Sequence, residues 1–243
     1  MNRLPKNYKI IVTDDQTETV YSPIYDEACH SPDGASEETK YNYILGCDIE
    51  EKLSKGKQIV VLDVGLGLAQ GLVELSKLNG RELINYYSVE IDKKFAIWAL
   101  ERLNIEYKIE FISNIEIISF NYENIQAKVI LGDANLTCPI IFETLSLKFD
   151  AIFQDPFSPK NNKDMWSVKW FNLLKAHSKA DIILSTYSAS SSVRKTLIHC
   201  GWILKGRKGF ANKRTSTLAY LSGKTDEQIL HQVKSQKVEI IDI

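Results

Sequence analysis

The sequence predicts an α/β fold, a doubly wound, Rossmann-like and mostly parallel sheet of seven strands, with a small N-terminal β-hairpin extension. Three observations support it. From Gln58 onward, short β-branched runs alternate with longer helical runs, as expected for repeated strand–helix units. The strand Val60 to Val64 enters a Gly65-Leu66-Gly67 turn that leads into a helix. A chain of 243 residues is also long enough for one such domain with additions.

Residues 1–50 are predicted to form an extension, a hairpin and a helix, packed on the core. Residues 8–13 and 19–21 are apolar and β-branched with polar residues between them, which indicates a small hairpin. A turn-rich segment follows. Ser36 then has the character of an N-cap, and the acidic residues after it open a helix that runs toward Cys47.

The core domain is predicted over residues 51–224. Its strands are expected at 59–64, 84–90, 127–131, 149–154, 181–186, 201–206 and 216–221. Helices are expected between them, at about 69–78, 93–104, 138–146, 164–178 and 189–199. Because no helix separates the last two strands, they are expected to pair as an antiparallel hairpin at one edge. Residues 225–243 form a tail, predicted as a short helix and an extended end.

Residues 105–123 are unusually rich in isoleucine for a connection. Two interpretations are open, an inserted lid or a helical packing piece, and the packing piece is favoured.

Composition excludes several classes of protein. The net charge is −1, so any binding of nucleic acid must rest on a local basic patch. No apolar run is long enough to cross a bilayer, and the N-terminus lacks a signal-peptide core, so no membrane is expected as a partner. The four cysteines form no CxxC pair and no metal spacing joins the histidines, which favours free thiols in a reducing cytoplasm and no metal site.

The glycine turn indicates a nucleoside-containing cofactor. Gly65 and Gly67 fit the first two glycines of a dinucleotide-binding turn, but Gln70 stands where the third belongs. Asp63, just before the turn, would repel a pyrophosphate but could accept hydrogen bonds from an amino-acid group. S-Adenosyl-L-methionine has an amino-acid arm and no phosphate, so it is the predicted cofactor.

Two further acids complete the predicted cofactor site. Glu90 closes the next strand and is expected on the ribose hydroxyls, and Asp133 with Ala134 is expected beside the adenine. Each acid alone is more often a loop cap than a ligand. Three of them at the ends of successive strands favour a site, and hence a class I methyltransferase fold.

A second motif, Asp155-Pro156-Phe157, ends the fourth strand and predicts the chemistry. An amine that accepts a methyl group must be neutral and aimed at the methyl carbon. The Asp155 carboxylate can accept the amine's hydrogens and stabilise the positive charge that grows on nitrogen, so it is the predicted catalytic residue and also borders the cofactor. Phe157 could pack on a flat base. The alternative is a strand ended by proline, with Asp155 as a helix cap.

The chain resembles the methyltransferases that make 5-methylaminomethyl-2-thiouridine at the wobble position of tRNA, some of which are fused to a flavin-dependent oxidoreductase domain. The resemblance covers about residues 20–221 and lies in four segments: 30–39, 65–67, 155–166 and 207–214. It implies that the substrate is bound by residues of three of these segments, namely His30, Ser31, Glu38, Pro156, Phe157, Met165, Trp166, Lys208, Phe210, Lys213 and Arg214.

The resemblance also implies an activity and partners. The reaction would convert 5-aminomethyluridine, or its 2-thio form, into the 5-methylaminomethyl nucleoside in the tRNA anticodon loop. The chain is too short to hold the oxidoreductase domain, so a separate oxidoreductase or aminomethyl-forming enzyme would act upstream. Three residues depart from the family pattern of glycines: Ala69, Pro156 and Ala211.

The segment 205–214 has a physical interpretation of its own. Its basic residues surround Phe210, and cations around an aromatic ring suit phosphates beside an unstacked base. The alternative is a solvated hairpin of mixed charge. Met165 and Trp166 are equally open, as core packing or as walls of the acceptor pocket.

Two rival functions remain at this point. One is a small-molecule amine N-methyltransferase, for which the basic residues would be dispensable. The other is a cofactor-binding partner subunit of a tRNA-modifying oxidoreductase, without catalysis of its own.

Overall fold

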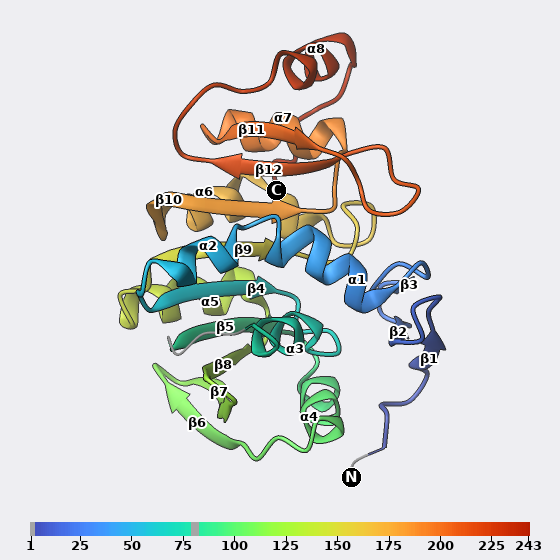
Figure 1. Ribbon diagram of the computed structural model, residues 1–243, viewed down its shortest axis with the longest axis vertical. Coiled ribbons are helices and arrows are strands. Elements are labelled where there is room, and N and C mark those ends of the chain that lie inside the picture. The colour runs from blue at the N-terminus through green and yellow to red at the C-terminus, as the bar shows by residue number, and fades with distance from the viewer. Residues whose placement is uncertain (1–2, 79–82) are drawn as a thin grey trace.

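A nine-stranded sheet forms the centre of the molecule in the computed structural model, which describes residues 3–78 and 83–243 (Figure 1). The strand order is β11-β12-β10-β9-β4-β5-β8-β7-β6. The strands are β4 (Ile59–Val64), β5 (Ile84–Glu90), β6 (Lys108–Ile112), β7 (Ile115–Tyr122), β8 (Ile125–Leu131), β9 (Phe149–Gln154), β10 (Ser178–Thr186), β11 (Ile203–Arg207) and β12 (Ser216–Tyr220).

The five central strands, β10, β9, β4, β5 and β8, are parallel to one another. From β4 the chain proceeds to β5 and β8 on one side, and then returns to β9 on the other side. This reversal places a topological switch point between β4 and β9, where α/β sheets bind their ligands. The predicted doubly wound, mostly parallel sheet is confirmed.

Both outer pairs of strands are antiparallel hairpins. The β11–β12 hairpin lies at one edge, with β12 next to β10, as predicted. At the other edge, residues 105–123 were expected to be a lid or a helical piece, and this expectation is wrong, because they form β6 and β7. These two strands raise the count from the predicted seven to nine.

The helices cover both faces of the sheet. They are α1 (Ala35–Thr39), α2 (Ile49–Ser54), α3 (Gln70–Ser76), α4 (Lys93–Arg102), α5 (Ala134–Thr144), α6 (Val168–Ala176), α7 (Ser191–His199) and α8 (Glu227–Ser235), with a π-helical turn η1 (Lys40–Ile44) and a 3-10 turn η2 (Lys163–Trp166). One core cluster packs α5, α6 and α7 on the sheet, and a second packs η1, α2, α3 and α4 on the opposite face. No helix among residues 3–78 and 83–243 is long and apolar enough to cross a membrane.

The N-terminal segment lies beside the carboxyl ends of the parallel strands, at the right of Figure 1. The predicted hairpin is confirmed as β1 (Lys9–Val12) and β2 (Glu18–Ser22), and a short third strand, β3 (Glu27–Ala28), extends it. The helix after it begins near the predicted place, but Ser36 is not its N-cap. That position is Gly34, which has no side chain to cap with.

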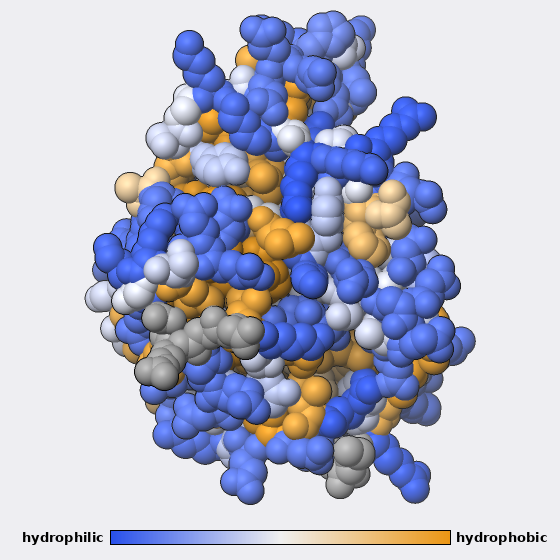
Figure 2. Space-filling model, in the orientation of Figure 1, coloured by the Kyte–Doolittle hydropathy of each residue, from blue (hydrophilic) through white to orange (hydrophobic). Residues whose placement is uncertain are grey.

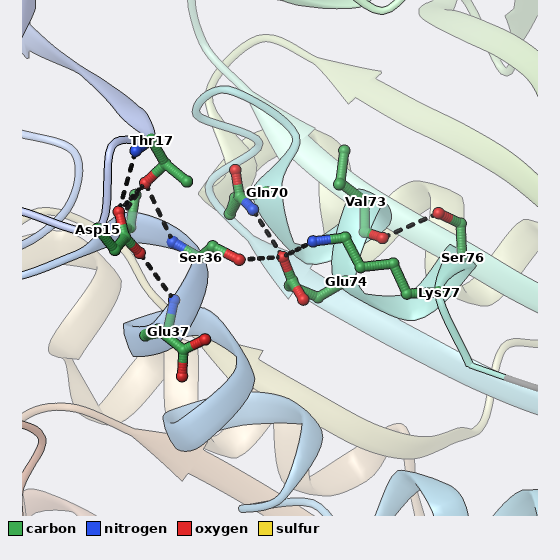
Figure 3. A network of polar contacts seen from close by, with 10 residues as sticks. Asp15, Thr17, Ser36, Glu37, Gln70, Val73, Glu74, Ser76 and Lys77 are labelled. Atoms are coloured by element: carbon green, nitrogen blue, oxygen red, sulfur yellow. Dashed lines mark hydrogen bonds and ion pairs between the residues drawn. The ribbon is translucent and has the colours of Figure 1, made fainter. Parts of the chain in front are cut away.

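Side chains from other elements satisfy the start of α1 instead (Figure 3). Asp15 Oδ2 accepts from the Glu37 amide at 3.2 Å, and Thr17 Oγ1 accepts from the Ala35 amide at 3.2 Å. Ser36 donates its hydroxyl to Glu74 on α3 at 2.6 Å. The N-terminal sheet is therefore tied to α1, and α1 to the core.

Candidate active site

A cavity of about 440 Å³ lies at the carboxyl ends of the parallel strands, between the sheet and the N-terminal segment. Its walls come from the ends of β4, β5, β8 and β9, from residues 8–38, and from the loop between β11 and β12. Most of the predicted site residues line it: His30, Ser31, Glu38, Gly65, Gly67, Glu90, Asp133, Ala134, Asp155, Pro156, Phe157, Met165 and Lys213. Asp63, Trp166, Lys208, Phe210 and Arg214 do not.

The glycine turn forms the floor of the cavity. Gly65 and Gly67 have φ values of +105° and +54°, a backbone region that favours glycine. A Cβ on Gly65 would lie 3.3 Å from the carbonyl oxygen of Asp155, so the missing side chain lets the turns after β4 and β9 approach each other. Ala69, which departs from the family's glycine, also has a left-handed φ of +59°, a conformation that costs an alanine about 1 kcal/mol.

Glu90 lies at the end of β5 with its carboxyl group in the cavity. Its Oε1 accepts from the amide of Asp92 at 2.9 Å. Burial disfavours the charged form and raises the pKa of Glu90 to about 7. Asp133 is exposed at the cavity's rim and caps α5 by accepting from the amide of Asn135 at 2.9 Å, so the loop-cap alternative describes part of what it does.

Asp63 lies outside the cavity, although a ligand role was predicted for it. Its Oδ2 accepts from the hydroxyl of Tyr86 at 2.5 Å, and its carboxylate packs against the start of α3, where a Cβ on Gly71 would lie 2.3 Å away. Burial raises the pKa of Asp63 to about 7. Asp63 is therefore held between Tyr86 and α3, next to the glycine turn, and does not line the cavity.

Asp155 faces the cavity from the end of β9, above the Gly65 turn. Its Oδ1 accepts a hydrogen bond from the hydroxyl of Tyr43, a residue to which the sequence interpretation gave no role. The pKa of Asp155 is raised well above its ordinary value, first by burial and then by the nearby carboxylate of Glu38, while the Tyr43 hydrogen bond acts in the opposite direction.

Aromatic residues hold the turn that follows Asp155, formed by Pro156 and Phe157. Tyr187 donates its hydroxyl to the carbonyl of Pro156 at 2.9 Å. Phe157 stacks on Tyr25 with ring centroids 4.4 Å apart, and both rings line the cavity. Trp166 is fully buried and donates its indole N–H to the carbonyl of Phe157 at 2.9 Å, so it packs behind the turn as the core alternative held.

The first matched motif, residues 30–39, forms the opposite wall. His30 shares a hydrogen bond between Nδ1 and Thr19 Oγ1 at 3.1 Å, and burial lowers its pKa to about 4, so it is neutral near pH 7. Glu38 is buried; its Oε2 accepts from the amide of Ser31 at 2.7 Å. Its Oε1 pairs with Lys213 Nζ at 2.6 Å, which joins this wall to the loop between β11 and β12.

The basic residues of segment 205–214 divide into two groups. Three have partners inside the protein: Lys213 pairs with Glu38, Lys205 with Asp226, and Arg207 stacks on the ring of Tyr41 at 3.8 Å. Lys208 and Arg214 are exposed and make no ion pair with any residue in the described part of the chain. At the place of this loop, upper right in the view, Figure 2 shows a small hydrophobic patch among hydrophilic side chains.

Several residues of the site were not identified from the sequence. Tyr8, Ser22, Tyr25 and Tyr187 line the cavity, and Tyr43 contacts Asp155 from outside it. Ser22 bears on the cofactor. It is buried and lines the cavity beside Tyr8, and within residues 3–78 and 83–243 its hydroxyl makes no hydrogen bond of ordinary geometry. A buried hydroxyl without a partner is costly, so this end of the cavity fits a ligand that carries hydroxyl groups.

Comparison with known proteins agrees with these features. A family described as S-adenosyl-L-methionine-dependent methyltransferases matches residues 99–222. The tRNA 5-methylaminomethyl-2-thiouridine biosynthesis bifunctional protein MnmC of Leptospira borgpetersenii is 30% identical over 217 residues, which are 81% of this chain and 32% of that protein. The protein of the same name from Burkholderia thailandensis is 25% identical over 216 residues, with the same coverage of 81% and 32%.

One solved structure is similar over nearly the whole chain. The crystal structure of MNMC2 from Aquifex aeolicus has a TM-score of 0.76 and 27% sequence identity, and the match covers 95% of this chain and 77% of that one. The chain spans about a third of the length of the curated relatives it matches.

Proposed function

Because this chain belongs to the family of S-adenosyl-L-methionine-dependent methyltransferases, we propose that it methylates the exocyclic amine of a 5-aminomethyluridine, with or without 2-thiolation, at the wobble position of tRNA. The observation that carries the proposal is the cavity itself, in which the glycine turn and Glu90 share one space with Asp155 and its aromatic turn.

The residues of one end of the cavity fit the cofactor. When bound, S-adenosyl-L-methionine supplies a methyl group on a positively charged sulfur, activated for transfer. Gly65 and Gly67 give its amino-acid arm close access to the backbone, and Glu90 and Ser22 offer polar groups for ribose hydroxyls. Asp133 and Ala134 border the space for the adenine.

The other end of the cavity fits an amine. Asp155 and Glu38 place two carboxyl groups there, which attract a protonated amine. The amine must lose a proton to water before its lone pair can form the new C–N bond while the bond between the methyl carbon and sulfur breaks, and the Asp155 carboxylate can accept an N–H of the neutral amine and so orient it. As the bond forms, nitrogen gains positive charge that a carboxylate stabilises. The proton released afterwards passes to Asp155 or to water.

The surroundings of this end support an RNA substrate. Phe157 and Tyr25 present flat rings in the cavity, and exposed cations lie on the loop that carries Lys213. A wobble base belongs to a single-stranded loop, so it can enter a pocket without the cost of opening a duplex. The proposed partner is therefore the tRNA anticodon loop, and a separate enzyme would supply the aminomethyl group.

The direct test is transfer of a labelled methyl group from S-adenosyl-L-methionine to tRNA that carries 5-aminomethyluridine, followed by nucleoside analysis. We expect label in the 5-methylaminomethyl nucleoside. Asp155→Asn should retain cofactor binding, measured by calorimetry, and lose about 100-fold or more in rate, since general acid–base and orienting groups contribute on that order.

Three results would contradict the proposal. No labelled wobble nucleoside from folded, cofactor-binding protein would support a binding subunit without catalysis. Equal methylation of a free polyamine-like amine, insensitive to salt, would support a small-molecule enzyme. Full activity in Asp155→Asn would remove the proposed role of that residue.

A further inference from the structure

Tyr43 is a buried residue that contacts the centre of the candidate site from behind the cavity wall. Only 2% of its surface is exposed, and its hydroxyl donates a hydrogen bond to Asp155 Oδ1. Its ring stacks on Phe153 of β9 with centroids 5.4 Å apart. Phe153 lies two residues before Asp155 on the strand that delivers it, so Tyr43 holds both the strand and the carboxylate.

An irregular turn of helix places Tyr43 there. Residues Lys40–Ile44 form the π-helical turn η1, in which the amide of Leu45 donates to the carbonyl of Lys40 at 3.0 Å. A π-turn holds one more residue than an α-turn, which rotates the following side chains, and such turns are frequent at functional sites. The chain after it is fixed closely, because a Cβ on Gly46 would lie 1.9 Å from the carbonyl oxygen of Asn42.

The electrostatic surroundings of Asp155 oppose its ionisation. The titratable groups that face it are Tyr43 from η1, Glu38 from α1, Cys29 after β3, Asp63 from β4, Tyr86 from β5, Tyr187 after β10 and Lys213 from the loop between β11 and β12. Lys213 is the one cation of this set, and its charge is already matched by Glu38 at 2.6 Å. Within the described residues, the Tyr43 hydroxyl is the one hydrogen-bond donor to the Asp155 carboxylate.

We propose that Tyr43 is a positioning residue for methyl transfer, whose hydroxyl favours the charged form of Asp155 and fixes one of its oxygens so that the other faces the acceptor amine. This inference rests on the proposed function of Asp155. A hydrogen bond to the charged form of a carboxyl group favours that form. Without the Tyr43 hydrogen bond, the burial and the negative charge around Asp155 would keep its carboxyl group protonated up to a higher pH. A protonated Asp155 cannot accept an N–H from the amine as the carboxylate does.

A second buried pair in the same sheet provides a matched control. Tyr86 donates its hydroxyl to Asp63 at 2.5 Å, also from one element to the end of a strand, but Asp63 lies outside the cavity. Tyr43→Phe and Tyr86→Phe therefore each remove one buried hydroxyl from one carboxylate. Only the first change touches the carboxylate that faces the cavity.

The experiment measures the pKa of Asp155 itself, by carbon NMR of protein labelled at the aspartate side-chain carboxyl, with Asp155→Asn to assign the signal. We expect Tyr43→Phe to raise the pKa of Asp155 by about one unit or more. The low-pH limb of the methyl-transfer rate should move upward by the same amount, with cofactor affinity at high pH unchanged. Tyr86→Phe should shift the Asp155 titration much less, because it reaches Asp155 only indirectly, through Asp63.

A graded variant protects the test against a fold defect in Tyr43→Phe. Difluorotyrosine at position 43 keeps the ring and hydroxyl but donates a stronger hydrogen bond, so it should lower the pKa of Asp155. An Asp155 titration that does not respond to either change at position 43 overturns the inference. Because this titration needs no tRNA, it separates a failure of the inference from a failure of the proposed substrate.

Discussion

Burial raises the pKa of Glu90, Asp63 and Asp155, and for Glu90 this has a consequence for cofactor binding. Its ordinary pKa of 4.5 is raised to about 7. Below pH 7 the group is therefore neutral and accepts fewer hydrogen bonds from ribose hydroxyls. The folded protein without ligand holds this proton more tightly than the unfolded chain, so the contribution of Glu90 to folding stability is lost as the pH rises through 7.

We therefore expect the dissociation constant for S-adenosyl-L-methionine to rise as the pH falls below 7, by at most about tenfold per pH unit. Calorimetry between about pH 5.5 and 8.5 would measure this dissociation constant over about one and a half pH units on either side of the pKa of Glu90. Glu90→Gln should bind weakly and without this pH dependence. Asp63→Asn serves as the control, because the pKa of Asp63 is also about 7 but its carboxylate lies outside the cavity. A slope that persists in Glu90→Gln would contradict the assignment.

The sequence predicted which acidic residues lie at strand ends better than it predicted the contacts of their side chains. Glu90 and Asp155 lie at the carboxyl ends of β5 and β9, the strands on either side of β4. Both residues reach the cavity because parallel strands end at the same edge of the sheet. Asp63 has the same place in the pattern, but its side chain turns under α3. The direction of a side chain at a strand end depends on its partner, here Tyr86 from β5, and that pairing is not visible in a single sequence.

Among the elements, the start of α3 depends on a glycine for a reason of packing. A Cβ on Gly71 would lie 2.3 Å from Asp63 Oδ2, while the φ of Gly71 is not in the left-handed region. Gly71→Ala gains helix propensity of about 1 kcal/mol but must displace a buried carboxylate from Tyr86. We expect a net loss of about 2 kcal/mol in the free energy of unfolding, as for other overpacked cores.

Urea denaturation of the ligand-free protein measures this change. Gly206→Ala is the matched control, since its new Cβ would meet nothing closer than 3.8 Å, and its effect should stay within about 0.5 kcal/mol. Equal stability of the two variants would show that the contact between Gly71 and Asp63 relaxes without cost.

Regular elements were predicted where one pattern dominates, and missed where tertiary contacts decide. The central strands β4 and β9 are almost entirely buried and consist mostly of apolar residues, so their places agree with expectation. Residues 105–123 mix isoleucine with polar residues, and the edge position that makes them β6 and β7 is set by pairing with β8. The caps of α1 come from Asp15 and Thr17, which are about 20 residues away in sequence, and no local signal reports them.

For the molecule as a whole, net charge does not predict an RNA partner, but the local distribution of charge supports the proposed one. Lys208 and Arg214 are exposed and unpaired within the described ranges, whereas Lys205 on β11 already pairs with Asp226 at 3.1 Å. We expect Lys208→Ala and Arg214→Ala each to weaken tRNA binding and to lower the slope of log affinity against log salt by about 1. Lys205→Ala should change the slope less.

Filter binding or fluorescence anisotropy over a series of salt concentrations gives this slope. The fold class and the cofactor followed from the sequence, and most of the predicted site residues line the cavity. The sequence did not show which basic residues are free to contact a phosphate, because the partners of Lys205, Arg207 and Lys213 come from distant parts of the chain.

Identical salt slopes for Lys208→Ala, Arg214→Ala and Lys205→Ala would argue against a tRNA contact at this loop.

The cavity is closed by residues that are far apart in the order of synthesis. Glu27 accepts a hydrogen bond from the amide of Ser158, and Glu38 pairs with Lys213, across separations of 131 and 175 residues. A nascent chain that has left the ribosome only as far as β10 has its glycine turn but lacks the last wall. The cavity therefore acquires its last wall only when the loop between β11 and β12 has been synthesised and has folded against α1.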